Sequence, residues 1–188
     1  MEQLKKSLRD GMSVMEGLIV MAIVVSMSAQ VLVSFTGLND NASLQQAARD
    51  LALNLRTAQN MSIAVSLPFG FVQTPPITGI HITNQSGSYA LFGDKSIPPN
   101  FIYNPPTETI QTFKFERNII INRVIIDSVE APSTQQENIA FVSPEATLYI
   151  VNDATGSSLG DKMVIELLAR SGQIKKVIVR TTGQISIQ

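Results

Sequence analysis

The sequence predicts an α+β fold, in which one long N-terminal helix packs on a C-terminal antiparallel β domain. Three observations support this class. Residues 17–35 carry no charge, apolar residues then recur at steps of three and four up to Val65, and β-branched runs alternate with turn sequences after Pro68. Because no proline precedes Pro68, one nearly continuous helix is expected from about Ser13 to Val65.

The first half of this helix has the composition expected of a membrane span. A short leader containing Lys5, Lys6 and Arg9 precedes the apolar run, and a helix crosses a bilayer with about 20 apolar residues. A basic leader favours a cytoplasmic N-terminus. The sequence therefore predicts a single-pass protein of the cytoplasmic (inner) membrane, with a transmembrane half over residues 12–38 and an exported domain over residues 39–188.

One carboxylate, Glu16, stands at the start of the apolar run, five residues after Gly11. A charge at the edge of such a run is costly unless it is paired, so Glu16 is a candidate functional residue. The order of charged leader, glycine and acid resembles the prepilin signal of type IV pilins and type II secretion pseudopilins. The resemblance implies a leader over residues 1–11, cleavage by a prepilin peptidase after Gly11, methylation of Met12, and a role for Glu16 in assembly.

This chain departs from the usual prepilin pattern in some details. Met12 stands where phenylalanine is most common, Gly17 follows the acid in place of a large apolar residue, and Val33 replaces a frequent proline. Two other interpretations of the segment stay open. One is an ordinary secretory signal cleaved near residues 26–28, and the other is an unprocessed single-span anchor.

The second half of the helix shows an amphipathic stripe, which predicts a face packed on the following domain. Residues 47–59, with recurring leucines and an Ala-Arg pair, resemble the corresponding stretch of GspH/FimT minor pseudopilins. The stripe consists of Leu44, Ala48, Leu51, Leu55, Ala58 and Val65.

The rest of the chain predicts antiparallel strands joined by turns. Residues 141–146 and 182–185 resemble a turn and the closing strand of the same pseudopilin family. Hairpins are expected over residues 79–92 and 162–180, with further strands at 113–116, 118–126, 140–142, 147–151 and 185–187.

Enzymatic activity is not expected. His81 is the only histidine, it lies in a strand pattern, and no nucleophile or glycine-rich phosphate loop accompanies it. No cofactor is predicted. The chain has no cysteine and a net charge of −1, so disulfides are excluded and bulk charge does not indicate a nucleic-acid binder.

Two weaker candidate sites follow from charge patterns. Arg170, Lys175, Lys176 and Arg180 lie close in sequence with no acid between them, which suggests either a DNA contact, as in some FimT-like minor pilins, or a solvated face.

No metal site is expected elsewhere, but three residues with side-chain oxygens bracket one turn. They either bind Ca²⁺ or belong to a solvated hairpin tip. These residues are Asn152, Asp153 and Asp161.

The resemblance implies a minor pilin or pseudopilin that assembles into a type IV pilus, a competence pilus or a type II secretion pseudopilus. Implied partners are the prepilin peptidase, other pilins contacted through the N-terminal helix, an inner-membrane assembly platform and a cytoplasmic ATPase. A membrane-anchored extracytoplasmic module that binds DNA or an exported substrate is the alternative. The sequence does not distinguish among the three machines.

Overall fold

The computed structural model describes residues 14–64, 77–131, 136–153 and 160–188, with side chains omitted for residues 31–38. The chain divides into two units, Met1–Asn39 and Asp40–Gln188. The sequence places the corresponding boundary after residue 38. One helix, α1 (Val14–Ile63), contributes residues to both units.

The amphipathic stripe of α1 belongs to the second unit and is buried there. Leu44, Ala48, Leu51, Leu55 and Ala58 are each at most 1% exposed, which confirms the packing predicted for this face. The Thr78 hydroxyl donates a hydrogen bond to the Ala58 carbonyl at 2.7 Å and ties the end of α1 to a strand. Val65, the last predicted member of the stripe, lies outside the described residues.

The first sheet is antiparallel and has the order β3-β2-β1-β6-β7. Ile80 at its centre pairs with Leu91 on one side and Ile139 on the other, so all three side chains face the same core. The hairpin predicted over residues 79–92 is confirmed. The strands are β1 (Ile77–Thr83), β2 (Ser88–Gly93), β3 (Thr109–Lys114), β6 (Gln136–Val142) and β7 (Thr147–Asn152).

The second sheet is also antiparallel, with the order β10-β9-β8-β4-β5. The hairpin predicted over residues 162–180 forms its centre, where Ile165 pairs with Val177 and with the core-facing Val124. The strands are β4 (Ile120–Ile126), β5 (Val129–Glu130), β8 (Lys162–Leu168), β9 (Ile174–Arg180) and β10 (Ile185–Ile187).

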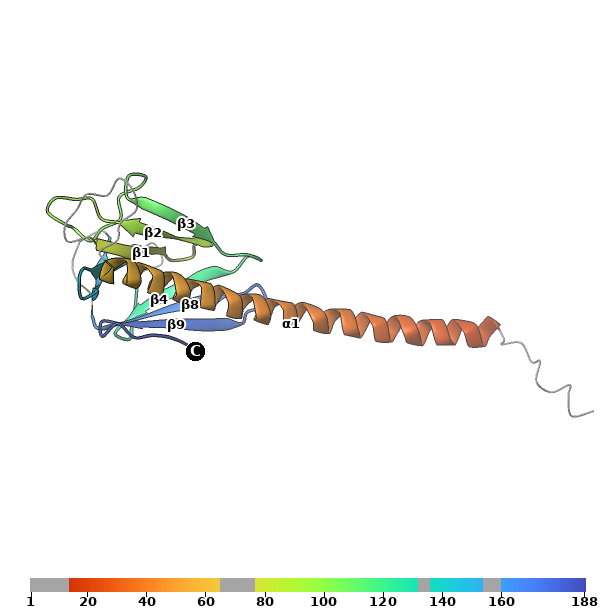
Figure 1. The fold of residues 1–188 in the computed structure, drawn as a ribbon. Coiled ribbons are helices and arrows are strands. Elements are labelled where there is room, and N and C mark those ends of the chain that lie inside the picture. The colour runs from red at the N-terminus through yellow and green to blue at the C-terminus, as the bar shows by residue number, and fades with distance from the viewer. Residues whose placement is uncertain (1–13, 65–76, 132–135, 154–159) are drawn as a thin grey trace, which may run out of the picture. The chain divides into compact units, whose positions relative to one another are not determined.

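A single hydrophobic core joins α1 to both sheets. Leu51 and Leu55 of α1, Ile80 and Ile139 of the first sheet, and Ile165 of the second sheet all belong to one cluster of buried residues. Figure 1 shows the orange half of α1 running along strands of both sheets. The helix therefore supplies a shared packing surface for two sheets that have no strand in common.

The expected fold class, a long helix with a membrane-spanning half packed on a β domain, is wrong as stated. The described fold beyond α1 is two five-stranded antiparallel sheets. The apolar part of α1, up to Asn39, is assigned to a different unit from these sheets. Among the described residues of α1, the buried members of the core cluster run from Leu44 to Ala58, in the amphipathic part of the helix.

The expected transmembrane helix and the expected single-pass location in the inner membrane are also corrected. Within the described residues, no helix is long and apolar enough to span a membrane. The apolar part of α1 for which side chains are described, residues 14–30, includes Glu16, Ser26, Ser28 and Gln30. These polar residues interrupt the apolar sequence within the described stretch.

Candidate functional site

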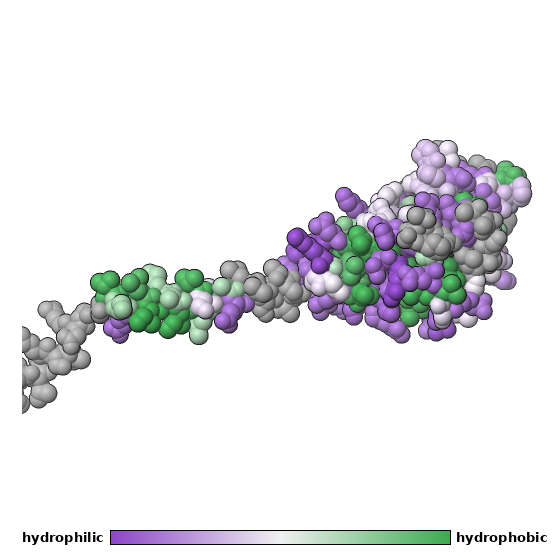
Figure 2. Space-filling view, turned by 180° about the vertical axis from the view of Figure 1, so that it is seen from behind, coloured by the Kyte–Doolittle hydropathy of each residue, from purple (hydrophilic) through white to green (hydrophobic). Residues whose placement is uncertain are grey.

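The N-terminal part of α1 exposes apolar side chains on every side. Residues in consecutive positions point in different directions around a helix, and here they are nearly all apolar. Figure 2 shows the resulting hydrophobic surface in green. The exposed fractions include 63% for Leu18, 56% for Ile19, 70% for Met21, 50% for Ile23 and 56% for Val24. A helix that is apolar all round requires cover from other chains or from an apolar phase.

Glu16 is the acidic residue of the first turn of α1 and is exposed. An acid at this position interacts favourably with the positive end of the helix dipole. The described residues supply no ion pair or hydrogen bond to its carboxylate. Gly11 and Met12, the predicted processing and methylation residues, lie outside the described residues.

The structure separates the four predicted basic residues. Lys176 and Arg180 lie on the outer face of β9, and Arg180 pairs with Lys162 of β8. Lys175 is on the opposite face of the strand because side chains alternate. Arg170 lies beyond the end of β8, in the turn before β9.

An acid missed by the sequence analysis neutralises part of this basic face. Glu166 of β8 lies opposite Lys176, and its carboxylate is 2.8 Å from the Lys176 ammonium. It also accepts hydrogen bonds from the Arg123 guanidinium and is only 1% exposed. Burial alone raises the pKa of Glu166, but the hydrogen bonds from Arg123 and Lys176 outweigh burial and lower it. The sequence does contain a sign of this ion pair, because Glu166 is the one acid within the apolar run of residues 163–168.

The three candidate Ca²⁺ ligands belong to separate hydrogen-bond networks. The Asn152 amide donates to Glu137 at 3.3 Å, and the Asp153 carboxylate accepts from the Asn138 amide at 2.8 Å. The Asp161 backbone N–H instead donates to the Asp127 carboxylate at 2.9 Å. Across the described ranges, no cluster of three or more histidine, aspartate or glutamate side chains could hold a metal ion.

His81 is the centre of a hydrogen-bonded chain on the first sheet. Because the Asn138 amide nitrogen donates to Asp153, the Asn138 carbonyl oxygen faces His81 Nδ1 at 2.8 Å and accepts a hydrogen bond from its N–H. Nε2 then accepts from the Thr83 hydroxyl at 3.3 Å. This network assigns a neutral imidazole with the proton on Nδ1. Burial lowers the pKa of His81, which agrees with that state.

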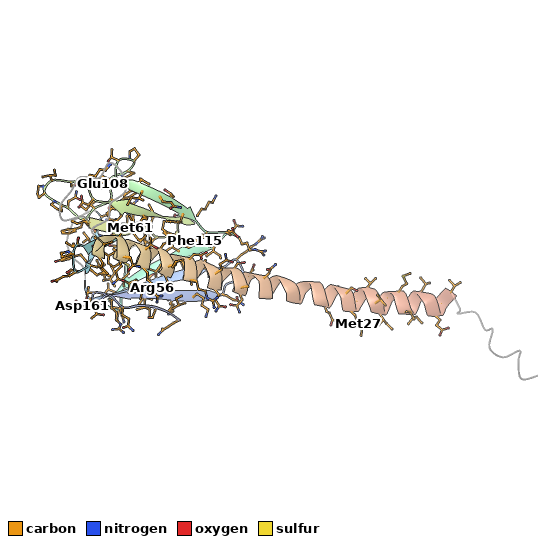
Figure 3. All side chains as sticks on the ribbon, viewed as in Figure 1. Met27, Arg56, Met61, Glu108, Phe115 and Asp161 are labelled. Carbon is orange, nitrogen blue, oxygen red and sulfur yellow. The ribbon has the colours of Figure 1, made fainter. Side chains whose placement is uncertain are left out.

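Two buried carboxylates hold the segment between β2 and β3, a feature that sequence analysis did not identify. Asp94 accepts from the backbone N–H groups of Ser96, Asn100 and Phe101, at 2.8 to 3.0 Å. Glu108 accepts from the backbone N–H groups of Lys95 and Asn104, at 2.9 and 2.8 Å. Figure 3 labels Glu108 beside the start of β3. Together these carboxylates replace the strand pairing that the segment lacks.

No family model, curated protein or solved structure matches this chain. The resemblance to pilins and pseudopilins accordingly stays a prediction based on the N-terminal pattern. Among the candidate residues, the described side chains around Glu16 present the most unusual surface, since they are apolar and uncovered. This part of α1 is therefore the candidate functional site.

Proposed function

We propose that this chain is a structural subunit of a filament of the type IV pilin or type II secretion pseudopilin kind. The observation that carries the proposal is the uncovered apolar surface of α1 around Leu18, Ile19 and Ile23. Burying one large aliphatic side chain stabilises an assembly by about 1.5–3 kcal/mol. Helices of neighbouring subunits provide the complementary apolar surface.

Glu16 supplies the specificity of this assembly. In a dry helix bundle its carboxylate requires a cationic partner, and none is present among the described residues of the same chain. Cleavage after Gly11 creates an amino group at Met12, and that group on a neighbouring subunit is the partner we assign. A buried ion pair contributes register more surely than net stability.

The remaining parts of the chain have separate roles in this proposal. A prepilin peptidase generates the new N-terminus, and an assembly platform driven by an ATPase inserts the subunit among other pilins. The second unit, with its two sheets, forms the folded body of each subunit. The chain itself performs no catalysis.

The test follows filament incorporation of Glu16 variants. Cells producing the assembly machinery are fractionated into cell and sheared-filament pools, and the subunit is followed by immunoblot. Glu16→Gln and Glu16→Ala should be processed normally but incorporated poorly, and Glu16→Lys should be the most defective because it opposes the neighbouring amino group. Glu145→Lys is the matched control, since Glu145 is also exposed but lies in the second unit. Equal incorporation of wild type and Glu16→Lys contradicts the proposal.

A further inference from the structure

Within the described part of the chain, strand β3 leaves one edge of the first sheet open. It is the terminal strand of the sheet, and the described strand that pairs with it is β2. The Phe115 N–H donates to the Gly87 carbonyl at 2.9 Å, and hydrogen-bonded pairs alternate along an antiparallel ladder. The backbone groups of Phe113 therefore face β2, whereas those of Thr112 and Lys114 face away from it. Such an edge is a template for another strand.

A groove runs between this edge and α1, with a volume of about 270 Å³. Ala47 and Leu53 of α1 line one side, and Phe113 and Phe115 line the other. Figure 3 marks Phe115 next to the helix. Leu53 is 62% exposed although it lies in the folded unit, so the groove offers apolar surface to a ligand.

The aromatic wall of the groove is held in place by contacts within the protein. The Tyr89 ring lies 5.2 Å from the Phe113 ring and 5.1 Å from the Phe115 ring. The Tyr89 hydroxyl accepts a hydrogen bond from the Asn54 amide of α1 at 2.7 Å. A wall fixed in this way loses little conformational entropy when a ligand binds.

The charges around the groove are mainly negative. Asp50 and Glu116 contribute two carboxylates, against one ammonium group from Lys114. A second groove lies on the other side of Leu53, next to edge strand β10. Its charges are mainly positive, since Arg49 and Arg56 line it together with a single acid, Asp50. The two open edges therefore differ in the charge of the segment that each one complements.

We propose that the groove beside β3 binds an extended segment of a partner protein, which adds to the sheet as a further strand. The segment hydrogen-bonds to the backbone groups of Thr112 and Lys114. It places a large apolar side chain against Phe113 and Phe115. Lysine or arginine residues two positions away, on the same face of the added strand, lie beside Asp50 and Glu116. This interaction is independent of filament assembly.

The probe is an acetylated, fluorescently labelled peptide, Thr-Lys-Val-Phe-Val-Lys-Thr, in which the two lysines and the phenylalanine share one face. Anisotropy of the peptide with the full chain should show saturable binding. A peptide with glutamate in place of both lysines should bind about tenfold more weakly at low salt. Hydrogen exchange should show new protection at the amides of Thr112 and Lys114, with little change at Phe113, whose N–H already donates to β2.

Proline substitution separates strand addition from simple apolar contact. Thr112→Pro removes an outward N–H without removing a hydrogen bond to β2, so the fold should persist while peptide affinity falls at least tenfold. Ile187→Pro is the matched control. The backbones of Lys176 and Gln188 exchange hydrogen bonds, so Ile187 faces the open edge of β10. That variant should bind the peptide as wild type does.

A charge-swap variant tests the proposal even if Thr112→Pro fails to fold. Asp50→Lys should weaken binding of the lysine peptide and strengthen binding of the glutamate peptide. Three results of the peptide experiments overturn the proposal. They are the absence of saturable binding, peptide-induced protection in β10 instead of β3, and affinity that is unchanged by Asp50→Lys. Self-association that Thr112→Pro abolishes, without peptide binding, also overturns it by assigning the groove to a second copy of this chain.

Discussion

Gly160 lies against the carboxylate of Asp127, so that a Cβ atom at residue 160 would overlap both the carboxylate carbon and one oxygen of that side chain. The Asp127 carboxylate cannot move aside without loss, because it accepts hydrogen bonds from the backbone N–H groups of Asp161 and Lys162, both at 2.9 Å. Gly160 also has a φ of +45°, which side-chain-bearing residues rarely adopt. The start of β8 therefore depends on the absence of a side chain here.

Gly160→Ala should destabilise the fold by about 2–4 kcal/mol, since it adds a steric clash to the backbone strain. Urea unfolding of the full chain measures the change. Gly172→Ala is the control, because Gly172 also has a positive φ, +83°, but a Cβ atom there has no neighbour within 4 Å. It should cost about 1 kcal/mol. Equal losses for the two variants contradict the steric explanation.

The buried face of α1 gives a second prediction. Leu51→Ala and Leu55→Ala should each destabilise the fold by about 2–5 kcal/mol, because both side chains are fully buried in the shared core. Leu53→Ala is a control of the same chemistry on the same helix, and its side chain is 62% exposed. Its effect should stay within about 0.5 kcal/mol. A large loss for Leu53→Ala would show that this face is covered in solution.

The ion pairs of Glu166 should respond asymmetrically to mutation. Removing both cations with Arg123→Met and Lys176→Met leaves a buried carboxylate unpaired, which should cost about 3–5 kcal/mol. Glu166→Gln should cost much less, because the side chains of Arg123 and Lys176 are 40% and 45% exposed and can reach water. Chemical denaturation of the full chain at neutral pH measures both. A milder effect for the double variant than for Glu166→Gln would contradict this account.

Glu137 should make the fold less stable at alkaline pH. It is fully buried, and no described group donates to its Oε2 atom. Burial raises the pKa of Glu137 to about 7, with a further contribution from Asp153 and an opposing hydrogen bond from Asn152. A raised pKa gives a stability contribution that is complete below 4.5 and lost as pH rises through about 7.

Glu137→Gln should therefore be more stable than wild type at pH 8, by about 2 kcal/mol, and similar to it near pH 5. Unfolding titrations at both pH values test this. Glu145→Gln, an exposed glutamate outside the network, is the control. A constant difference between wild type and Glu137→Gln across this range would exclude titration of Glu137 as the cause.

His81 should make the fold less stable at acid pH, the opposite of the effect of Glu137. Burial lowers its pKa, although Asn138 and Asp153 partly oppose that shift. Its stability contribution is present above 6.5 and is lost as pH falls through the lower value of the folded state. His81→Gln should flatten the acid limb of the stability profile. Nitrogen NMR should find the proton on Nδ1 at neutral pH, and a proton on Nε2 would contradict the hydrogen-bond assignment.

Local patterns in the sequence were sufficient for some elements and insufficient for others. The steps of three and four from Leu44 to Ala58 correctly predicted a buried helix face, and turn residues correctly placed the hairpins around residues 84–87 and 170–173. The pairing of β1 with β6 and of β4 with β8 was not predictable, because it joins residues more than 35 positions apart.

The candidate sites also depended partly on local sequence and partly on strand pairing between distant residues. Arg170, Lys175 and Lys176 are close in sequence, but strand alternation separates the two lysines and pairing with β8 brings Glu166 to Lys176. The span prediction rested on the absence of charge over residues 17–35, and no helix of the described residues is long and apolar enough to cross a membrane. The processing prediction at Gly11 and Met12 stays untested, since these residues lie outside the described part of the chain.

The carboxylates of Asp94 and Glu108 have a consequence for how this protein can diverge. They hold the segment between β2 and β3 through backbone N–H groups, which every residue except proline possesses. The Ser96 hydroxyl and the Asn104 amide add two side-chain hydrogen bonds to Glu108, both at 3.3 Å. The side chain of Ile97, which is 91% exposed, takes no part in this attachment. The two acids can thus preserve the path of the chain while exposed side chains such as that of Ile97 change, so related chains can differ in surface recognition without a change of fold.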